Sequence, residues 1–325
     1  MTIIEAFLLS LTCSMLEPAT QPQSQLAEAS VALPDGESTD RFQLGTSEWV
    51  ALHFFAYHAT RAQAGLDDWM SVPLLPKDAA LLANPTIAAE FAPVAELYTP
   101  VMELPLVRGG LFSFLIGLDE APESIEDPDN RAVLEAFMPI YRKYFWPRHR
   151  AMAELFAHEM RAEIAIHGPA MAAAVADELD SGWGDRDYTV YALPYVNWAG
   201  AMSGAGHVYL SAQEEELANP PLEIFFHETA HNRPIGEKIR PAAEAALAAH
   251  GLESDRFWHY LLFYATGRAA KRVLGDDYVT YTEATGLRTR EDTKPWYDAL
   301  EAVWDEHNTL EDRAMAAAAL VAAGQ

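Results

Sequence analysis

Two histidines separated by three residues are the feature of this chain best suited to chemistry. They are His227 and His231, in the pentad His-Glu-Thr-Ala-His. Residues four apart in a helix share one face and lie about 6 Å apart along its axis. Both imidazoles can therefore reach one zinc ion at about 2.1 Å. Glu228 follows the first histidine, where it can take a proton from a water at the metal without binding the ion. The pentad thus predicts a zinc site with His227 and His231 as ligands and Glu228 as the base.

The residues around the pentad favour a helix. Asn219 is of a type that caps helix starts, and Pro220 suits a first turn. Glu223 adds negative charge at the positive end of the helix, and Pro234 ends it beyond the second histidine. The alternative is a pentad that arose by chance, which the cap and the stop make less attractive. The apolar residues that can face a core are Leu222, Phe225 and Phe226.

The rest of the chain predicts many helices and one small sheet. Two strands are predicted, over residues 187–196 and 206–211, with a glycine-containing loop between them. His149, His158 and His167 are too widely spread to share one metal ion, and we expect them at the surface. Residues 104–118 predict either a hairpin or two buried turns. Helices are predicted over 48–61, 131–144, 147–167, 169–182 and 255–274.

A small sheet whose edge strand precedes an HExxH helix resembles the zincin metallopeptidases. The resemblance covers about residues 187–290, whereas residues 1–150 match no zincin subfamily. It implies an α+β, predominantly helical fold in which the small sheet packs on the pentad helix. It also implies that Glu228 acts as general base and proton shuttle in the hydrolysis of peptide or amide bonds. In that family the edge strand, here residues 206–211, pairs with an extended peptide or protein substrate.

A catalytic zinc site usually has three protein ligands and one water, and two glutamates compete for the third position. Glu237 lies ten residues after His227, where metzincins carry their third ligand, but Pro234 stands where that pattern has glycine. Glu283 has the ligand type of gluzincins, but it lies 52 residues after His231. It could equally orient a zinc-bound imidazole from outside the metal shell.

The third candidate, His259, is our prediction. Gluzincins take their third ligand from a helix that packs against the pentad helix, and His259 is the metal-competent residue in the apolar half of the predicted helix 255–274. The alternative is a core histidine bonded to a backbone carbonyl. Tyr264 and Tyr281 are candidates to stabilise an oxyanion, as a tyrosine or histidine does in gluzincins, and ordinary packing is the alternative for each.

Composition limits the partners. The chain has 325 residues, half of them apolar, and a net charge of −26. This acidity argues against binding to nucleic acid or to anionic membranes. The single cysteine, Cys13, excludes an internal disulfide. The sequence contains no run of 18 apolar residues, so it predicts no transmembrane helix.

The N-terminus leaves the compartment open. Residues 6–16 are apolar over the length of a signal peptide, but the first five residues carry Glu5 and no lysine or arginine. If the segment is a signal, the protein is periplasmic or secreted. If it is a helix that docks on the core, the protein is cytoplasmic.

These observations predict three regions. Residues 1–46 are a possible signal segment and linker, 47–150 a mainly helical N-terminal region, and 151–325 the zincin-like catalytic region. The predicted function is a zinc-dependent hydrolase. A non-enzymatic, zinc-stabilised binding protein that retains the pentad is the alternative, and a metal-free helical scaffold is a third hypothesis.

Overall fold

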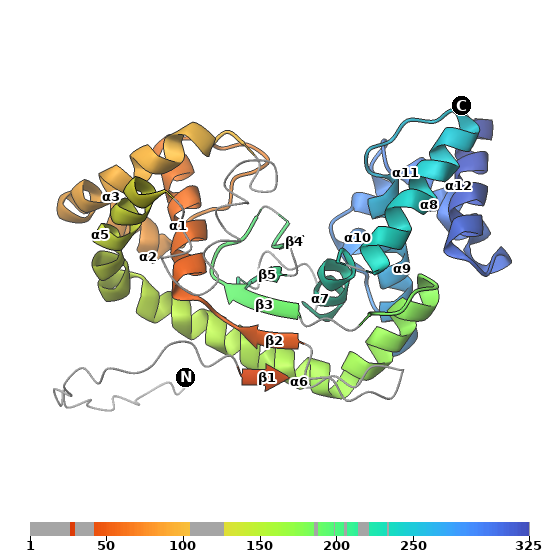
Figure 1. The fold of residues 1–325 in the computed structure, drawn as a ribbon, viewed down its shortest axis with the longest axis horizontal. Helices are drawn as coiled ribbons and strands as arrows, with labels where there is room; N and C mark the ends of the chain where they lie inside the picture. Colours follow the sequence, from red (N-terminus) through yellow and green to blue (C-terminus); the bar gives the residue numbers. More distant parts are fainter. Residues whose placement is uncertain are drawn as a thin grey trace, which may run out of the picture.

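Helices and one mixed sheet make up the architecture (Figure 1). The computed structural model describes residues 27–29, 42–104, 127–184, 188–197, 199–204, 207–213, 221–232 and 234–324. Within these ranges five short strands form one sheet in the order β1-β2-β3-β5-β4. The predicted α+β, predominantly helical fold is confirmed, and the sheet contacts the pentad helix through β4 and β5.

The sheet differs from the prediction at its edge. β5 (His207–Ser211) lies between β3 (Tyr188–Leu193) and β4 (Ala201–Gly204), so the strand predicted at 206–211 is not an edge strand. β4, which lies in the predicted loop, is the edge and pairs antiparallel with β5. Four residues are too few to show a clear alternation of apolar and polar side chains. The prediction therefore mistook this short strand for a loop.

The other end of the sheet is built from the predicted linker. β2 (Phe42–Gly45) pairs in parallel with β3, and β1 (Ala27–Ala29) pairs antiparallel with β2. Phe42 lies opposite Tyr188 in this register. Residues 27–29 and 42–45 thus contribute to the sheet, although the composition of their surroundings is that of a linker.

Side-chain alternation in β3 divides the interior into two cores. Tyr188, Val190 and Ala192 face one core, and Tyr191 and Leu193 face the other. Successive residues of a strand point to opposite faces, so one strand can serve both cores. The sheet therefore has a buried face on each side.

The core beyond Tyr191 and Leu193 is covered by N-terminal helices. Ser47 caps the first of them through a hydrogen bond from the Val50 amide, as predicted. Only Leu104 of the predicted hairpin or turns at 104–118 lies within the described residues. The elements of this group are α1 (Glu48–Gln63), α2 (Pro76–Leu82), α3 (Pro85–Tyr98), η1 (Thr99–Val101) and α5 (Pro128–Tyr144).

One long helix, α6 (Trp146–Glu178), runs beneath the sheet (Figure 1). The prediction of two helices that meet at residues 167–169 is wrong, since α6 continues through Pro169. A proline inside a helix removes one backbone hydrogen bond, but α6 is packed along its length against α5, β3, α7 and α9. His149 is also fully buried rather than at the surface, because Tyr141 and Asp78 bond its two ring nitrogens at 2.9 Å.

The second core lies among the C-terminal helices, at the other end of the molecule in Figure 1. α8 packs on α9 and α12, and α9 packs on α6 and α7. No described helix combines the length and apolar character that a membrane span requires. The elements are α7 (Pro221–Ala230), α8 (Ile235–His250), α9 (Phe257–Leu274), α10 (Tyr281–Ala284), η4 (Leu287–Thr289), α11 (Lys294–Val303), η5 (Trp304–Glu306) and α12 (Leu310–Gly324).

Candidate metal centre

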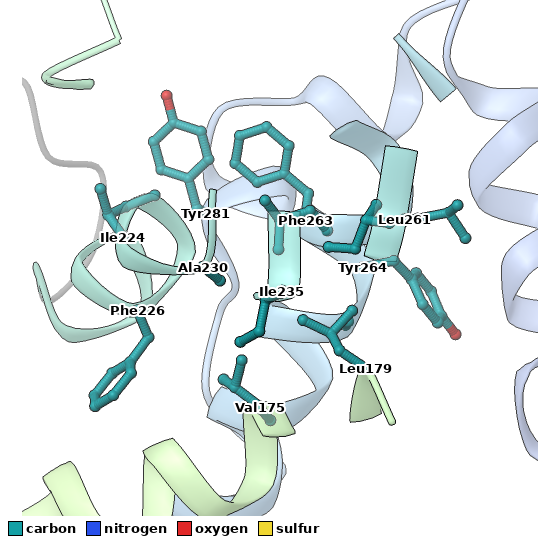
Figure 2. Close-up of a cluster of buried hydrophobic side chains, with 14 of the residues drawn as sticks. Val175, Leu179, Ile224, Phe226, Ala230, Ile235, Leu261, Phe263, Tyr264 and Tyr281 are labelled. Atoms are coloured by element: carbon teal, nitrogen blue, oxygen red, sulfur yellow. The ribbon is translucent and has the colours of Figure 1, made fainter. Parts of the chain in front are cut away.

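Helix α7 carries the first half of the site. Its apolar residues lie in the core, with Phe226 pointing toward α6 and Ala230 on the side of the helix that faces Ile235 and Tyr281 (Figure 2). The helix ends at Ala230, and His231 lies in the turn that follows. Pro234 lies after the end of α7 and directly before α8, which agrees with its predicted role in ending the pentad helix. Asn219 and Pro220, the predicted cap and first turn, lie outside the described residues.

Three imidazoles converge where α7 meets α9. The Nε2 atom of His227 lies 3.0 Å from Nε2 of His259 and 3.1 Å from Nε2 of His231. The three ring centroids form a nearly equilateral triangle with sides of 4.8 to 5.0 Å. His259, the predicted third ligand, is therefore brought to the pentad. Metal binding by the three residues remains a prediction.

The chemistry of these nitrogens fits a metal ion. Tetrahedral zinc with Zn–N bonds of about 2.1 Å places its ligand nitrogens about 3.4 Å apart, close to the separations found here. Hydrogen bonding alone fits less well, because a neutral imidazole nitrogen offers either one proton or one in-plane lone pair. Nε2 of His227 faces two other nitrogens at once. Three lone pairs directed at one ion would account for that arrangement.

The electrostatic surroundings keep the three imidazoles neutral. Burial is the largest cause, and it lowers the pKa of His259 to about 4 and those of His227 and His231 well below the ordinary value. Neighbouring histidines lower the pKa of His227 and His231 further. A neutral imidazole has the free lone pair that a metal ligand needs. The three imidazoles thus keep their lone pairs free near neutral pH.

Glu228 lies beside the histidines and next to the edge of the sheet. One of its carboxylate oxygens is 3.8 Å from Nε2 of His231. Burial raises its pKa to about 7, and a hydrogen bond with Ser203 of β4 works in the opposite direction. A carboxyl group with a pKa near the working pH can both take and return a proton. This position and environment suit a general base.

A stack of three rings supports the centre. Phe263, one turn after His259, stacks on His227 at 3.8 Å and on Tyr281 at 5.5 Å. The Thr266 hydroxyl lies 3.5 Å from Nδ1 of His227, on the ring edge away from the other histidines. Packing and outer contacts of this kind fix the orientation of a ligating imidazole.

The two candidate tyrosines differ in their surroundings. Tyr281 lies beside Phe263 in Figure 2, and its hydroxyl donates to the carbonyl of Ala199 at 3.3 Å. Burial, and then the charge of Glu228, raises its pKa to about 12. Tyr264 points the other way and donates to Glu301 at 3.1 Å. Tyr281 therefore remains a candidate to stabilise an oxyanion, and Tyr264 does not.

The competing glutamates lie outside the histidine cluster. Glu283 caps the start of α10 through Thr280 and forms an ion pair with Lys271 at 2.8 Å. Glu237 is exposed on α8. Within the described part of the chain, one group of side chains could hold a metal ion, and it consists of His227, His231 and His259.

The sequence analysis did not predict the positions of two residues in the site. Gly236 lies so close to His231 that a Cβ atom would be 2.8 Å from the His231 carbonyl carbon. Glu223 was assigned only to the helix start, but it is buried one turn before His227 and accepts a hydrogen bond from the Tyr281 amide at 2.9 Å. The four-residue spacing from His227 was the available signal for Glu223, whereas nothing local marks Gly236.

Comparison with known proteins assigns no family to these residues. No family model, no curated protein and no solved structure matches the chain. The function is therefore argued from the geometry and chemistry of the site.

Proposed function

We propose that this protein is a zinc-dependent hydrolase of peptide or amide bonds, of the zincin type. The observation that carries the proposal is the convergence of the Nε2 atoms of His227, His231 and His259 beside a buried carboxyl group. Three nitrogen ligands leave a tetrahedral ion one position for water or substrate, which is the arrangement of catalytic zinc. That carboxyl group, Glu228, is placed to move the proton.

The chain's own residues then have distinct roles. Zinc, when bound, supplies polarisation of the scissile carbonyl and a lowered pKa for the attacking water. His227, His231 and His259 hold and orient the ion. Glu228 takes the proton of the attacking water and passes it to the leaving amine. Tyr281, which Phe263 holds in the ring stack, donates a hydrogen bond to the developing oxyanion once it leaves the Ala199 carbonyl.

The edge strand β4 is suited to hold an extended substrate. It is the last strand on that side of the sheet within the described residues, and its Ser203 hydrogen-bonds to Glu228. A peptide added to this edge would gain main-chain hydrogen bonds and pass next to the proposed base. The substrate role predicted for residues 206–211 thus moves to Ala201–Gly204.

A conservative substitution tests the proposal. Glu228→Gln keeps the size of the side chain and removes the proton acceptor, so zinc content should stay near wild type. Peptide hydrolysis should fall by a factor of about 10² to 10⁴. His227→Ala should lose the metal. Glu159→Gln, at an exposed position on α6, is the matched control and should change neither property.

Two results would refute the proposal. One is peptide hydrolysis at the wild-type rate by the Glu228→Gln variant. The other is a zinc-loaded wild-type protein that cleaves nothing in a broad peptide library, which would favour the zinc-stabilised binding protein. Metal analysis by mass spectrometry and cleavage followed by peptide mass mapping provide both measurements.

A further inference from the structure

Two arginines border the half-buried side of the histidine cluster. Arg240 of α8 places its guanidinium carbon 3.5 Å from the ring centroid of Trp258. That ring stacks on His259 at 4.8 Å and meets His231 edge-on at 5.3 Å. Arg256 directly precedes α9, and its carbonyl accepts the amide of His259 at 2.9 Å. One side of the cluster therefore carries cationic residues.

The Arg240 guanidinium is close to the centre on the scale of a peptide. Its distance from the His259 ring cannot exceed the two separations through Trp258 taken together. An extended chain advances about 3.3–3.6 Å per residue. Since an ion would lie beyond that ring, the guanidinium is within about three extended residues of it, and a peptide that runs over this side of the cluster would meet Arg240.

The charges of these arginines are available to a ligand. Arg240 and Arg256 are exposed, and neither forms an ion pair with any residue that the structure describes. Partial burial lowers the pKa of Arg240, and the charge of Glu244, one turn further along α8, opposes that shift from beyond ion-pair distance. Both arginines lower the pKa of His259, so their field reaches the centre. Two positive side chains thus lie near the centre in a chain of net charge −26.

The contact with Trp258 orients the guanidinium. A guanidinium placed over an indole gains cation–π energy through its face, and the N–H groups at its edge stay free to bind. Those groups match a carboxylate with two parallel hydrogen bonds. If Arg240 and Trp258 served only to stabilise the fold, their contact alone would be enough and no carboxylate would be bound.

We propose that Arg240, oriented by Trp258, binds a substrate carboxylate within about three residues of the cleaved bond, so that the site selects anionic peptides. The inference rests on the proposed function, since it names the substrate class of the same centre. The carboxylate has two sources, an aspartate or glutamate side chain and the C-terminus of the peptide. Arg256 adds to the local field and is not required for the two parallel hydrogen bonds.

Binding to matched peptides tests the inference. The probes are alanine-based octapeptides that carry one Glu, or Gln in its place, at each position in turn. Each is made with a free C-terminal acid and with a C-terminal amide. Calorimetry with the Glu228→Gln variant measures affinity without turnover, and mass spectrometry with the wild-type protein measures cleavage. A Glu-dependent gain identifies the side chain as the source, and an acid-dependent gain identifies the terminus.

The expected result is an affinity about tenfold higher for at least one carboxylate-bearing peptide than for its neutral counterpart. Arg240→Gln should abolish that ratio, and Arg240→Lys should keep only part of it, because lysine lacks the paired N–H groups. Arg150→Gln makes the same change in net charge at an exposed position on α6 and should leave the ratio unchanged.

The outcomes separate this inference from the proposed function. Cleavage without any preference for a carboxylate, or a preference that persists in Arg240→Gln, overturns the inference and leaves the hydrolase standing. Carboxylate binding that depends on Arg240, in a protein that cleaves none of the peptides, supports the inference and refutes the hydrolase. A preference lost equally in Arg240→Gln and Arg150→Gln reflects net charge and also overturns it.

Discussion

Replacement of Gly236 by alanine tests whether the start of α8 holds His231 in place. Alanine normally stabilises a helix relative to glycine by about 1 kcal/mol. Here the added methyl group would lie 2.8 Å from the His231 carbonyl carbon and closer still to its oxygen. Both atoms belong to backbone, and the amide of Gly236 is bonded to the Asn232 carbonyl at 2.8 Å. The clash therefore cannot be relieved by rotation of a side chain.

The size of the effect follows from the distances. Carbon atoms pack at about 3.5–4.0 Å, so the His231 backbone must move by roughly 0.7 Å or more. Metal–ligand distances tolerate only about 0.2 Å. Loss of outer support for a ligand typically lowers metal affinity by about 10 to 100-fold, which is about 1.4–2.8 kcal/mol. We expect a loss of that size in Gly236→Ala, with the overall helical content retained.

Competition with a chromophoric chelator gives the zinc affinity, and circular dichroism gives the helical content. Gly182→Ala is the matched control, because a Cβ atom there has nothing within 4 Å and the residue is exposed. It should bind zinc as the wild type does. The reasoning about His231 is wrong if Gly236→Ala binds zinc within a factor of about two of the wild type and its Tm, followed by circular dichroism, is not lower.

Three further predictions follow from the same site and from the other core. His259→Ala should lose most of the bound zinc, and Glu283→Ala should keep it, which metal analysis of the purified variants decides. Tyr281→Phe should retain zinc but lower kcat by about 10²; an unchanged kcat would exclude a role for its hydroxyl. Burial lowers the pKa of His58 to about 4 from 6.5, so the folded protein holds this imidazole neutral. The contribution of neutral His58 to stability is present above pH 6.5 and declines as the pH falls, because the unfolded chain takes up the proton first. Relative to His58→Gln, the wild type should lose about 2 kcal/mol between pH 7 and pH 5 in urea unfolding.

Local patterns predicted the elements that carry the three histidines. The pentad helix, the apolar helix with His259 and the strand at 188–193 all follow from periodicity and helix boundaries within a short window. The meeting of His259 with the pentad was predicted by a resemblance, and the structure places the three rings together.

Pairing between distant segments was not predictable in the same way. β2 joins β3 across more than 140 residues of sequence, so nothing local identifies its partner. His149 is buried because Asp78, 71 residues away in the chain, bonds to it. A residue judged only by its neighbours in sequence would be placed at the surface.

The fine structure of the site depends on such contacts as well. Ser203 meets Glu228 because the edge strand passes the pentad helix, and Arg240 meets Trp258 because α8 crosses the start of α9. Each contact joins two elements whose relative position is set by the whole core. The sequence therefore predicted the three histidines that come together but not the residues around them.

The continuity of α6 limits how far the molecule can be reduced. Near its start, His149 is bonded within one core, and at its end Glu178 accepts a hydrogen bond from Trp304 at 2.7 Å in the other. A fragment truncated within α6 would keep all three histidines but uncover the sheet face that carries Tyr191 and Tyr209. Exposed aromatic surface of that kind promotes aggregation. The smallest autonomous unit that contains the candidate metal centre therefore includes the N-terminal helices.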